Sequence, residues 1–566
     1  MSEWDFETDF LILGSGAGGM ASALAAHDAG MSALVLEKTA QYGGTTAQSG
    51  GVVWIPNNHQ MPKHAIKDSE QDAWDYLSRV TKGAVDEKRL RAYIRYAPEM
   101  IKRFEDVSEV KFDALPKYID YYPELPGGKP GGRSMEPLPV SLKCLGDIWH
   151  QQRLTLAPKI LGRVSITAKE SQHIMNLGLP IYAIIAKRLL AYYMDIPARI
   201  KKLPDVRQTL GCALTVRLRH SLLKRDIPLW LNAKVEELLV DGLRVVGAAV
   251  SYQNKVLRIR AAKGVMLAAG GFGHNAQLRE KFHPQSTGNA WTSESDGNVG
   301  DAITLGQALG AQLEFMQCAW WTPSYMLPSG LPIPLVIGKS LPGSIFVNKK
   351  GRRFTNEAAP YEDVVKAQYL SHARGDGCVP CHMVFDARFR RSYPAGPIMP
   401  SRMQPDNAIP AEFKNANFLK RGETIEELAE KIGVDAANLV DEINKNNRYA
   451  ASGKDLDFGR GNSSHDHYYS DKKIKPNPNI APIIEPPFYS FEIYPGDLGT
   501  KGGLKADEFG RVLNTKNEPI AGLYVTGNNS AAVMGDSYPG AGSTIGPAMT
   551  FGYIAARHAA NIYSSH

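Results

Sequence analysis

Residues 10–37 read Phe10-Leu-Ile-Leu-Gly14-Ser-Gly16-Ala-Gly-Gly19, then an alanine-rich run to Gly30, then Ala33-Leu-Val-Leu-Glu37 after two intervening residues. An apolar run of strand length meets a glycine-rich turn, a helix follows, and a second apolar strand ends in an acid. Gly14 permits the tight turn, Gly16 lets backbone N–H groups approach a pyrophosphate, and Gly19 lets helix and strand pack closely. The positive end of the helix dipole faces the phosphates, and Glu37 can accept hydrogen bonds from a ribose. The stretch therefore predicts a Rossmann-like dinucleotide-binding unit rather than an ordinary glycine-rich turn.

Length and composition predict a globular protein with more than one domain. The chain has 566 residues, of which 43% are apolar and 22% charged. The N-terminus has neither a basic nor an apolar region, so we expect no signal peptide. Five scattered cysteines favour a reducing, cytoplasmic location. Cys378 and Cys381 form the one close pair. The absence of a second pair favours a plain loop over a redox or metal pair, and we expect no metal site.

Residues 143–205 carry most of the positive charge. They hold ten lysines and arginines against four acids, a net charge of +6 out of +7 for the whole chain. Residues 174–194 are largely apolar and aromatic, but Pro180, Lys187 and Arg188 interrupt them, which argues against a spanning helix. Basic residues around such a helix suit a segment that lies in a membrane interface, on the inner face of the membrane. A helical insertion at a subunit contact is the alternative, and nucleic acid is disfavoured.

A second glycine-rich loop follows the first unit and reads Gly43-Gly-Thr45-Thr46-Ala-Gln-Ser-Gly-Gly51. Its small residues let the backbone pass close to a flat ligand. Placed after such a unit, this loop resembles the flavoproteins of the fumarate reductase and succinate dehydrogenase superfamily. The resemblance implies FAD as the cofactor. Members with covalent flavin carry a histidine in this loop, so Thr45 and Thr46 imply that FAD is held non-covalently.

Further glycine-rich segments match the same superfamily at residues 265–275, 295–301, 502–504, 523–529 and 537–551. The last of them leads into a helix whose dipole can stabilise negative charge on a reduced flavin. The resemblance implies that FAD contacts Gly14, Ser15, Gly16, Ala17, Gly18, Gly19, Glu37, Lys38, Gly43, Gly44, Thr45, Thr46, Ala47, Ser49, Gly50, Gly51, Val235, Ala269, Gly270, Gly271, Asp301, Gly527, Asn528, Gly542 and Ile545.

Three motifs narrow the resemblance to the 3-ketosteroid Δ1-dehydrogenases. They are Tyr118-Ile-Asp-Tyr121-Tyr-Pro-Glu, Phe354-Thr-Asn-Glu-Ala-Ala-Pro-Tyr361 and Ser537-Tyr538-Pro-Gly-Ala-Gly542-Ser-Thr-Ile-Gly-Pro-Ala-Met-Thr-Phe. Fumarate reductases would instead show arginine and histidine for dicarboxylate binding. The basic segment 143–205 is similar to the insertion of enzymes that take sterols keeping their side chain, such as cholest-4-en-3-one Δ1-dehydrogenase.

This resemblance implies a 3-oxosteroid 1-dehydrogenase that makes a C1=C2 double bond beside a C3 ketone. FAD N5 takes the C1 hydride, and Tyr361, as tyrosinate, takes the C2 proton with Tyr121 hydrogen-bonded to it. Tyr538 O–H and Gly542 N–H bind the C3 oxygen, where negative charge develops. An unperturbed tyrosine titrates near pH ~10, so the site must favour tyrosinate, or activity should be highest at alkaline pH.

Two other functions stay open at this point. One is a 3-ketosteroid Δ4-(5α)-dehydrogenase on the same fold, and the other is a non-catalytic flavoprotein subunit of a membrane electron-transfer complex. The sequence has no haem-attachment motif and no iron–sulfur cysteine set. It has no second dinucleotide fingerprint either, so a quinone or a soluble carrier is the expected electron acceptor.

The expected fold is α/β. Residues 1–280 and 490–566 should form a Rossmann-like FAD-binding domain that carries the insertion 143–205, and residues 281–489 an inserted α+β substrate domain. We expect a helix at 211–223, strands of a small antiparallel unit at 229–235 and 245–251, and an amphipathic helical stretch at 424–448. Residues 346–361 read as strand, turn and strand, then a loop.

Overall fold

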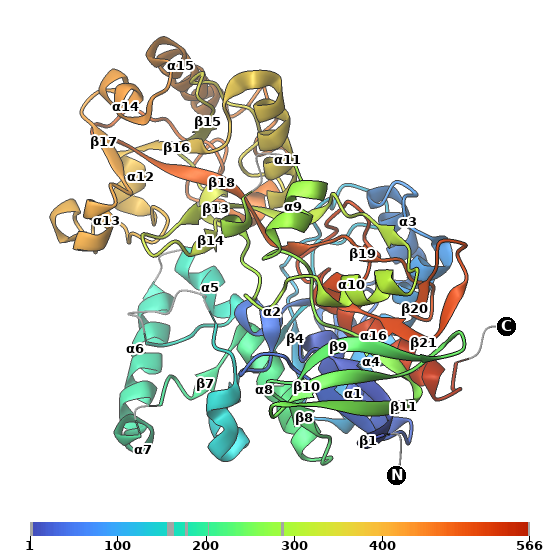
Figure 1. Ribbon diagram of the computed structural model, residues 1–566. Helices are drawn as coiled ribbons and strands as arrows, with labels where there is room; N and C mark the ends of the chain where they lie inside the picture. Colours follow the sequence, from blue (N-terminus) through green and yellow to red (C-terminus); the bar gives the residue numbers. More distant parts are fainter. Residues whose placement is uncertain (1–3, 156–162, 176–178, 202, 285–287, 564–566) are drawn as a thin grey trace. The chain divides into compact units, whose positions relative to one another are not determined.

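The computed structural model describes residues 4–155, 163–175, 179–201, 203–284 and 288–563 (Figure 1). The chain divides into two compact units. Unit 1 comprises residues 1–275, 294–318 and 500–566, and unit 2 comprises residues 276–293 and 319–499. Each unit therefore combines segments that are distant in the sequence.

Three segments lie in a different unit from the one expected, and the shortest is 276–280, which belongs to unit 2. Residues 294–318 belong to unit 1, because Thr45 Oγ1 accepts hydrogen bonds from Ser295 N at 2.9 Å and Asn298 Nδ2 at 3.0 Å. Residues 490–499 belong to unit 2, because β18 (Phe488–Thr500) pairs with β16 (Cys381–Asp386). Neither contact has a signal in the local sequence.

Unit 1 is built on an eight-stranded sheet in the order β20-β21-β10-β11-β1-β2-β8, with β9 paired to β10. Its strands are β1 (Phe6–Leu13), β2 (Ala33–Leu36), β8 (Leu229–Trp230), β9 (Lys234–Asp241), β10 (Arg244–Tyr252), β11 (Lys255–Leu267), β20 (Arg511–Leu513) and β21 (Pro519–Val525). β1 runs parallel to β2 and β11, and β11 runs parallel to β21. The continuous apolar runs of β1 and β2 are buried, as a parallel sheet requires.

The strand expected at 229–235 is two strands. β8 joins the main sheet parallel to β2, whereas β9 starts at Lys234 and pairs antiparallel with β10. The break between them has a local cause, because Asn232 has a φ of +54° and its N–H bonds to Thr39 O. The antiparallel part, β9 to β11, is thus an extension of the main sheet and not a separate unit.

The helices of unit 1 include the expected helix at 211–223. They are α1 (Ala17–Asp28), α2 (Gly44–Gln48), α3 (Glu70–Val80), α4 (Glu87–Val107), α5 (Ala168–Met175), α6 (Leu179–Met194), α7 (Ile196–Ile200), α8 (Leu210–Leu223), α10 (Asp301–Ala308) and α16 (Ile545–Ala559). A glycine brings α1 and α16 together, because a Cβ on Gly552 would lie 2.5 Å from Ser22 Oγ and 2.7 Å from Gly18 O. The first and last helices of the unit therefore pack in backbone contact.

The remaining strands of unit 1 are short. They are β3 (Val53–Trp54), β4 (Phe112–Ala114), β5 (Ser134–Pro137), β6 (Val140–Ser141), β7 (Arg207–Gln208), β12 (Leu313–Glu314) and β19 (Gly503–Leu504). β3, β5 and β4 form a three-stranded antiparallel sheet, and β6 pairs with β7. The insertion lies between β6 and β7, so this pairing closes its two ends together.

The insertion is fixed to unit 1 through buried polar groups near its base. The Glu136 carboxylate accepts hydrogen bonds from Ala168 N at 2.7 Å and Lys169 N at 3.3 Å, at the start of α5. Glu170 accepts from Arg188 at 2.5 Å and from Arg207 at 3.1 Å. In Figure 1, α6 and α7 follow α5 in sequence. Among the described helices, none is long and apolar enough to cross a membrane.

Unit 2 has a six-stranded sheet in the order β14-β13-β18-β16-β15, with β17 paired to β18. Besides β16 and β18, its strands are β13 (Ala319–Met326), β14 (Pro332–Pro334), β15 (Ser344–Val347) and β17 (Lys420–Gly422). Its helices are α9 (Ala276–Phe282), α11 (Tyr361–Ser371), α12 (Ala387–Ser392), α13 (Ala411–Asn415), α14 (Ile425–Ile432) and α15 (Ala436–Ser452). Phe346, Phe385 and Phe491 lie in its buried apolar core.

The helical stretch expected at 424–448 is two helices. Gly433 has a φ of +68° and ends α14, and the Asp435 carboxylate then caps α15 by accepting from Asn438 N at 2.8 Å. The other expected loop, at Cys378 and Cys381, leads into β16, and both thiols are buried and free. No group of metal ligands occurs among the residues that the structure describes.

Candidate active site

The expected cofactor residues gather at one edge of the unit 1 sheet. Leu13 is level with Leu36 and with Leu267, and Leu267 is level with Val525, so four parallel strands end together. The turns that follow these strands therefore meet at this edge. They contain residues 14–19, 37–38, 269–271 and 527–528.

The glycine turn between β1 and α1 leaves no space for side chains at two positions. Gly14 has a φ of +106°, and a Cβ there would lie 2.2 Å from Ala268 O. A Cβ at Gly19 would lie 2.0 Å from Gly14 O. Gly14 is therefore required by the close approach of the turn after β11, and Gly19 by packing within its own turn.

Glu37 is held beside this turn at the end of β2. Its carboxylate accepts hydrogen bonds from Ser15 Oγ at 2.5 Å and from Thr39 N at 3.0 Å. The Ser15 hydroxyl in turn accepts from Gly43 N at 3.1 Å. Ser15 therefore links the glycine turn to the second glycine-rich loop, and Thr39 is a partner that sequence reasoning missed.

The second glycine-rich loop forms α2 and the turn after it. Thr46 Oγ1 accepts from Ala17 N at 3.1 Å, at the start of α1, and Thr45 Oγ1 binds the 295–298 loop as described above. A Cβ on Gly51 would lie 2.6 Å from Gly211 N, so Gly51 packs against α8. Gly43, Ala47, Ser49 and Gly50 lie in the same short segment.

The other expected cofactor residues flank the same edge. Lys38 forms an ion pair with Asp301, the first residue of α10. Ala233 N donates to Glu37 O at 2.9 Å, which places Val235 of β9 two residues beyond this contact. Ile545 is the first residue of α16.

Glu294 is a buried residue of this region that sequence reasoning missed. Its carboxylate accepts from Gly273 N at 2.8 Å, Thr500 N at 3.1 Å and Asn528 Nδ2 at 3.3 Å. It therefore joins three segments that are far apart in the sequence. Its neighbours in the chain give no signal of this role, because each partner comes from another part of the fold.

The backbone at this edge fits a dinucleotide. A Cβ on Gly44 would meet nothing within 4 Å, one on Gly16 would meet only Thr46 Oγ1 at 3.6 Å, and one on Gly527 only Ala548 Cβ at 3.9 Å. Protein packing thus leaves the backbone open at all three positions, although the positive φ of Gly44 (+48°) and Gly527 (+73°) already favours glycine there. They lie at the first turns of α1, α2 and the 3-10 turn η8 (Gly527–Asn529), where free N–H groups suit phosphate and flavin oxygens.

Two of the expected catalytic tyrosines lie together in unit 1. The rings of Tyr121 and Tyr538 meet edge to face, with centroids 5.3 Å apart, and both residues are buried. Tyr121 N donates to Pro539 O at 2.9 Å, and Tyr76 Oη donates to the same carbonyl at 2.5 Å. The loop of Tyr121 and the loop of Tyr538 are therefore hydrogen-bonded to each other.

Trp54 connects the same two loops from β3. Its backbone N donates to Gly542 O at 3.1 Å, and its indole Nε1 donates to Asp120 Oδ1 at 2.8 Å. Gly542 has a φ of +100°, and a Cβ there would lie 2.4 Å from the carbonyl carbon of Val53. Packing against β3 thus already requires glycine at position 542.

Asp120 also anchors the Tyr121 loop to a fully buried arginine. Arg133 Nη1 donates to Asp120 Oδ2 at 2.9 Å, and Arg133 Nη2 pairs with Asp68 at 2.7 Å. Burial alone would lower the pKa of Arg133, but the two carboxylates raise it above its ordinary value. The guanidinium is therefore permanently charged and fixes both acids.

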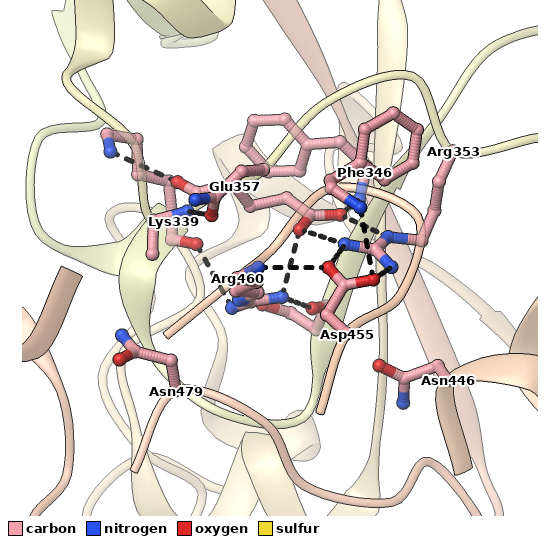
Figure 2. A network of polar contacts seen from close by, with 12 residues as sticks. Lys339, Phe346, Arg353, Glu357, Asn446, Asp455, Arg460 and Asn479 are labelled. Carbon is pink, nitrogen blue, oxygen red and sulfur yellow. Dashed lines mark hydrogen bonds and ion pairs between the residues drawn. The ribbon is translucent and has the colours of Figure 1, made fainter. Parts of the chain in front are cut away.

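Tyr361 belongs to unit 2, where it is the first residue of α11 and is buried. It begins a helix and does not lie in a loop as expected. Figure 2 shows the buried network that surrounds the segment before it. The Glu357 carboxylate accepts from Phe346 N at 3.0 Å, from Arg353 at 2.9 Å and from Arg460 at 3.2 Å. Burial would raise the pKa of Glu357, but Arg353 and Arg460 hold it below its ordinary value.

Comparison with known proteins places nearly the whole chain among flavoproteins. The model of the FAD binding domain family matches residues 9–545. The 3-oxosteroid 1-dehydrogenase of Mycobacterium tuberculosis is 39% identical over 98% of this chain and 98% of its own length.

Solved structures give the same result. The 3-ketosteroid Δ1-dehydrogenase from Sterolibacterium denitrificans, in complex with 1,4-androstadiene-3,17-dione, has a TM-score of 0.95 and 44% identity, covering 98% of this chain and 100% of that chain. The 3-ketosteroid Δ4-(5α)-dehydrogenase from Rhodococcus jostii RHA1 has a TM-score of 0.67 and 20% identity, covering 99% of this chain and 98% of that chain. The second likeness extends to the fold alone.

Removing the buried carboxylate of Asp120 should lower the free energy of unfolding far more than removing an exposed carboxylate. Asp120→Ala leaves Arg133 with one carboxylate and Trp54 Nε1 without its acceptor, so we expect a loss of about 3 kcal/mol in the free energy of unfolding. Asp113→Ala is the control, because the Asp113–Lys169 pair is exposed and should contribute about 1 kcal/mol at most. Denaturant unfolding measures both, and equal losses would contradict the anchoring role of Asp120.

Proposed function

This chain belongs to the 3-oxosteroid 1-dehydrogenase family of FAD-binding flavoproteins, and on that premise we propose that it introduces a C1=C2 double bond into 3-ketosteroids. The substrates would be sterol-derived 3-oxo-Δ4 steroids. Bound FAD supplies the hydride acceptor for the C1 hydrogen. The observation that carries the proposal is the pairing of Tyr121 with Tyr538 beside Gly542, in a chain similar to these relatives over almost its full length.

The proposed oxygen site is formed by Tyr538 O–H and Gly542 N–H. Hydrogen bonds to the C3 oxygen make the C2 proton more acidic, because negative charge moves onto that oxygen as the proton leaves. The fixed backbone around Pro539 and Gly542 supports this assignment, since a donor contributes most when it needs no reorganisation.

The proposed base is Tyr361, as tyrosinate, with Tyr121 hydrogen-bonded to it. A phenol titrates near pH ~10 when unperturbed, so proton abstraction should become faster as the pH rises toward that value. The position of Tyr361 at the N-terminus of α11 supports the assignment, because the positive end of a helix dipole favours a nearby anion.

Two alternative functions are less well supported. A Δ4-(5α)-dehydrogenase would form a C4=C5 bond, and the solved protein with that activity shares only 20% identity with this chain. A flavoprotein subunit of an electron-transfer complex would need a protein partner and would not turn over a free ketosteroid. For the reoxidation of FAD we propose a quinone or a soluble carrier.

We also propose that the insertion 143–205 binds the surface of an anionic membrane. Large apolar side chains are exposed on α6 and α7, including Leu190, Met194 and Ile200. Lys187 lies in α6 and Lys201 directly follows α7, and both lysines are exposed. Apolar residues flanked by cations suit the boundary between lipid headgroups and acyl chains. Glu136 and Glu170 fix the base of the insertion to unit 1.

The activity is tested by product analysis under anaerobic conditions. Enzyme with bound flavin is mixed with a 3-oxo-Δ4 steroid and with the corresponding saturated 5α-steroid. Bleaching of the flavin, with a 1,4-diene as the product of the first steroid, would support Δ1-dehydrogenation. A C4=C5 product from the second steroid alone would favour the Δ4-(5α) activity, and no bleaching with either would favour the subunit function.

Tyr361→Phe removes the proposed base and keeps the ring that packs at the start of α11. We expect the variant to fold and bind FAD but to lose nearly all turnover, because no group then accepts the C2 proton. Steady-state kinetics measure this loss. Turnover within a factor of about three of the wild type, roughly 0.65 kcal/mol, would show that Tyr361 is not the base.

Tyr538→Phe removes one proposed donor to the C3 oxygen. We expect kcat to fall by about 10²–10³, the usual loss for one such donor, with little change in flavin affinity. Exchange of the C2 hydrogen with solvent deuterium should slow in parallel, because enolisation needs the same donor. Lost dehydrogenation with wild-type C2 exchange would instead assign Tyr538 to substrate positioning or hydride transfer.

Glutamine in place of the basic residues of 143–205 should weaken binding to anionic liposomes. Each lysine or arginine near such a surface contributes about 1 kcal/mol. Flotation with anionic and with neutral vesicles measures the effect, and a variant with the same number of substitutions on exposed lysines of unit 2 is the control. Wild-type flotation of the insertion variant would favour the subunit-contact interpretation.

A further inference from the structure

Lys339 is a buried lysine of unit 2 that the proposed chemistry does not use. It lies in the 3-10 turn η4 (Gly338–Ser340) and is 1% exposed. Its Nζ donates to Glu357 O at 3.0 Å, to Ser340 Oγ at 3.4 Å and to Ala359 O (Figure 2). Within the described part of the chain, no carboxylate forms an ion pair with it.

The two carbonyls that bind Lys339 belong to the segment directly before Tyr361. This segment ends in Pro360, which lies at the N-cap of α11 and makes no side-chain cap hydrogen bond. Proline has no N–H, so position 360 donates no backbone hydrogen bond that could fix the segment. The Glu357 side chain is held by Arg353 and Arg460, and Lys339 holds the backbone carbonyls of Glu357 and Ala359.

We infer that Lys339 is a positioning residue for Tyr361, holding the carbonyls of Glu357 and Ala359 so that α11 begins with the phenol in one fixed place. This inference rests on the proposed function, in which Tyr361 takes the C2 proton. A base must lie within hydrogen-bond reach of the proton it removes, and a shift of about 1 Å can cost as much as 100-fold in rate.

The chemistry of the site agrees with a lysine that acts as a donor. The ammonium form has three N–H groups for its three acceptors, and the neutral amine, which predominates at alkaline pH, still has two for the carbonyls of Glu357 and Ala359. Burial lowers the pKa of Lys339 to about 7. Asp466, Asp363 and Glu357 oppose this effect and Arg460 adds to it, so these four are the charged groups that act on the lysine. Two carbonyl oxygens and a hydroxyl oxygen accept hydrogen bonds from Nζ, although no acid pairs with it directly.

The experiment compares Lys339→Met, Lys339→Gln and the control Lys350→Met, each as enzyme with bound FAD. Methionine matches the lysine side chain as far as Cε and has no donor, and glutamine keeps a donor that is one bond shorter. Lys350 forms an exposed ion pair with Asp376 in the same unit. For each variant, kcat, KM, C2 exchange with solvent deuterium and amide hydrogen exchange of residues 355–365 are measured.

We expect Lys339→Met to lower kcat and C2 exchange by the same factor, about tenfold or more, with KM and flavin content close to wild type. Amide exchange of residues 355–365 should accelerate in the same variant. In kcat, C2 exchange and amide exchange, Lys339→Gln should lie between Lys339→Met and the wild type. Lys350→Met should match the wild type in every measurement. A general loss of stability would instead lower flavin content and accelerate amide exchange across the whole unit.

Wild-type kcat and wild-type amide exchange in Lys339→Met would overturn the inference. If that variant is not obtained with bound flavin, Lys339→Gln decides in the same way, since it should fold and still lose kcat by a smaller factor, about threefold or more. The experiment also distinguishes failure of the proposed function from failure of the inference about Lys339. Wild-type enzyme that neither exchanges C2 hydrogen nor oxidises a ketosteroid would refute the function, whereas active variants beside an active wild type would refute the role of Lys339 alone.

Discussion

The parallel register of β1 with β2 and β11 is the constraint on which the rest of unit 1 depends. Because Leu13, Leu36 and Leu267 lie level, the turns after these strands meet at one edge. Close approach of these turns leaves no space for side chains at Gly14 and Gly19, and at Gly16 it leaves the backbone open. One register therefore decides both where the backbone packs on itself and where it can receive a dinucleotide.

In both units, a buried arginine holds acidic side chains next to a proposed catalytic tyrosine. Arg133 binds Asp68 and Asp120 next to the Tyr121 loop, and Arg353 binds Glu357 before Tyr361. Taking such ions out of water costs several kcal/mol each, so a buried pair is weak evidence for added stability. These pairs fix the orientation of the side chains, because a bidentate guanidinium holds the acids that it binds in one geometry. Irregular loops carry Tyr121 and Tyr538 and lead into Tyr361 at the start of α11, and loops need such fixed points more than helices or strands do.

The sequence predicts the parts of this protein that depend on local chemistry. Residues 10–37 fold as expected because the glycines permit the turn and the apolar runs set the strands. Glu294 and the 294–318 segment were not predictable, since their partners lie far away in the chain. The same holds for Arg133, whose neighbours in the sequence do not reveal two buried acids. At 424–448, Gly433 followed by Asp435 is a local signal for the end of one helix and the start of another. The acidic amphipathic pattern on either side nevertheless predicted one helical stretch.

The insertion 143–205 has a structure that can be understood separately from that of the site. It begins and ends at the paired strands β6 and β7, so it adds length without disturbing the register of the main sheet. At its base, Glu170 accepts from two arginines and Glu136 caps α5, which buries polar groups with their partners. Farther along, Leu190 and Ile200 are exposed, although exposed apolar groups are unfavourable in water. A segment that satisfies its polar groups at one end and exposes apolar ones at the other has the structure expected of an element whose far surface is covered when the protein works.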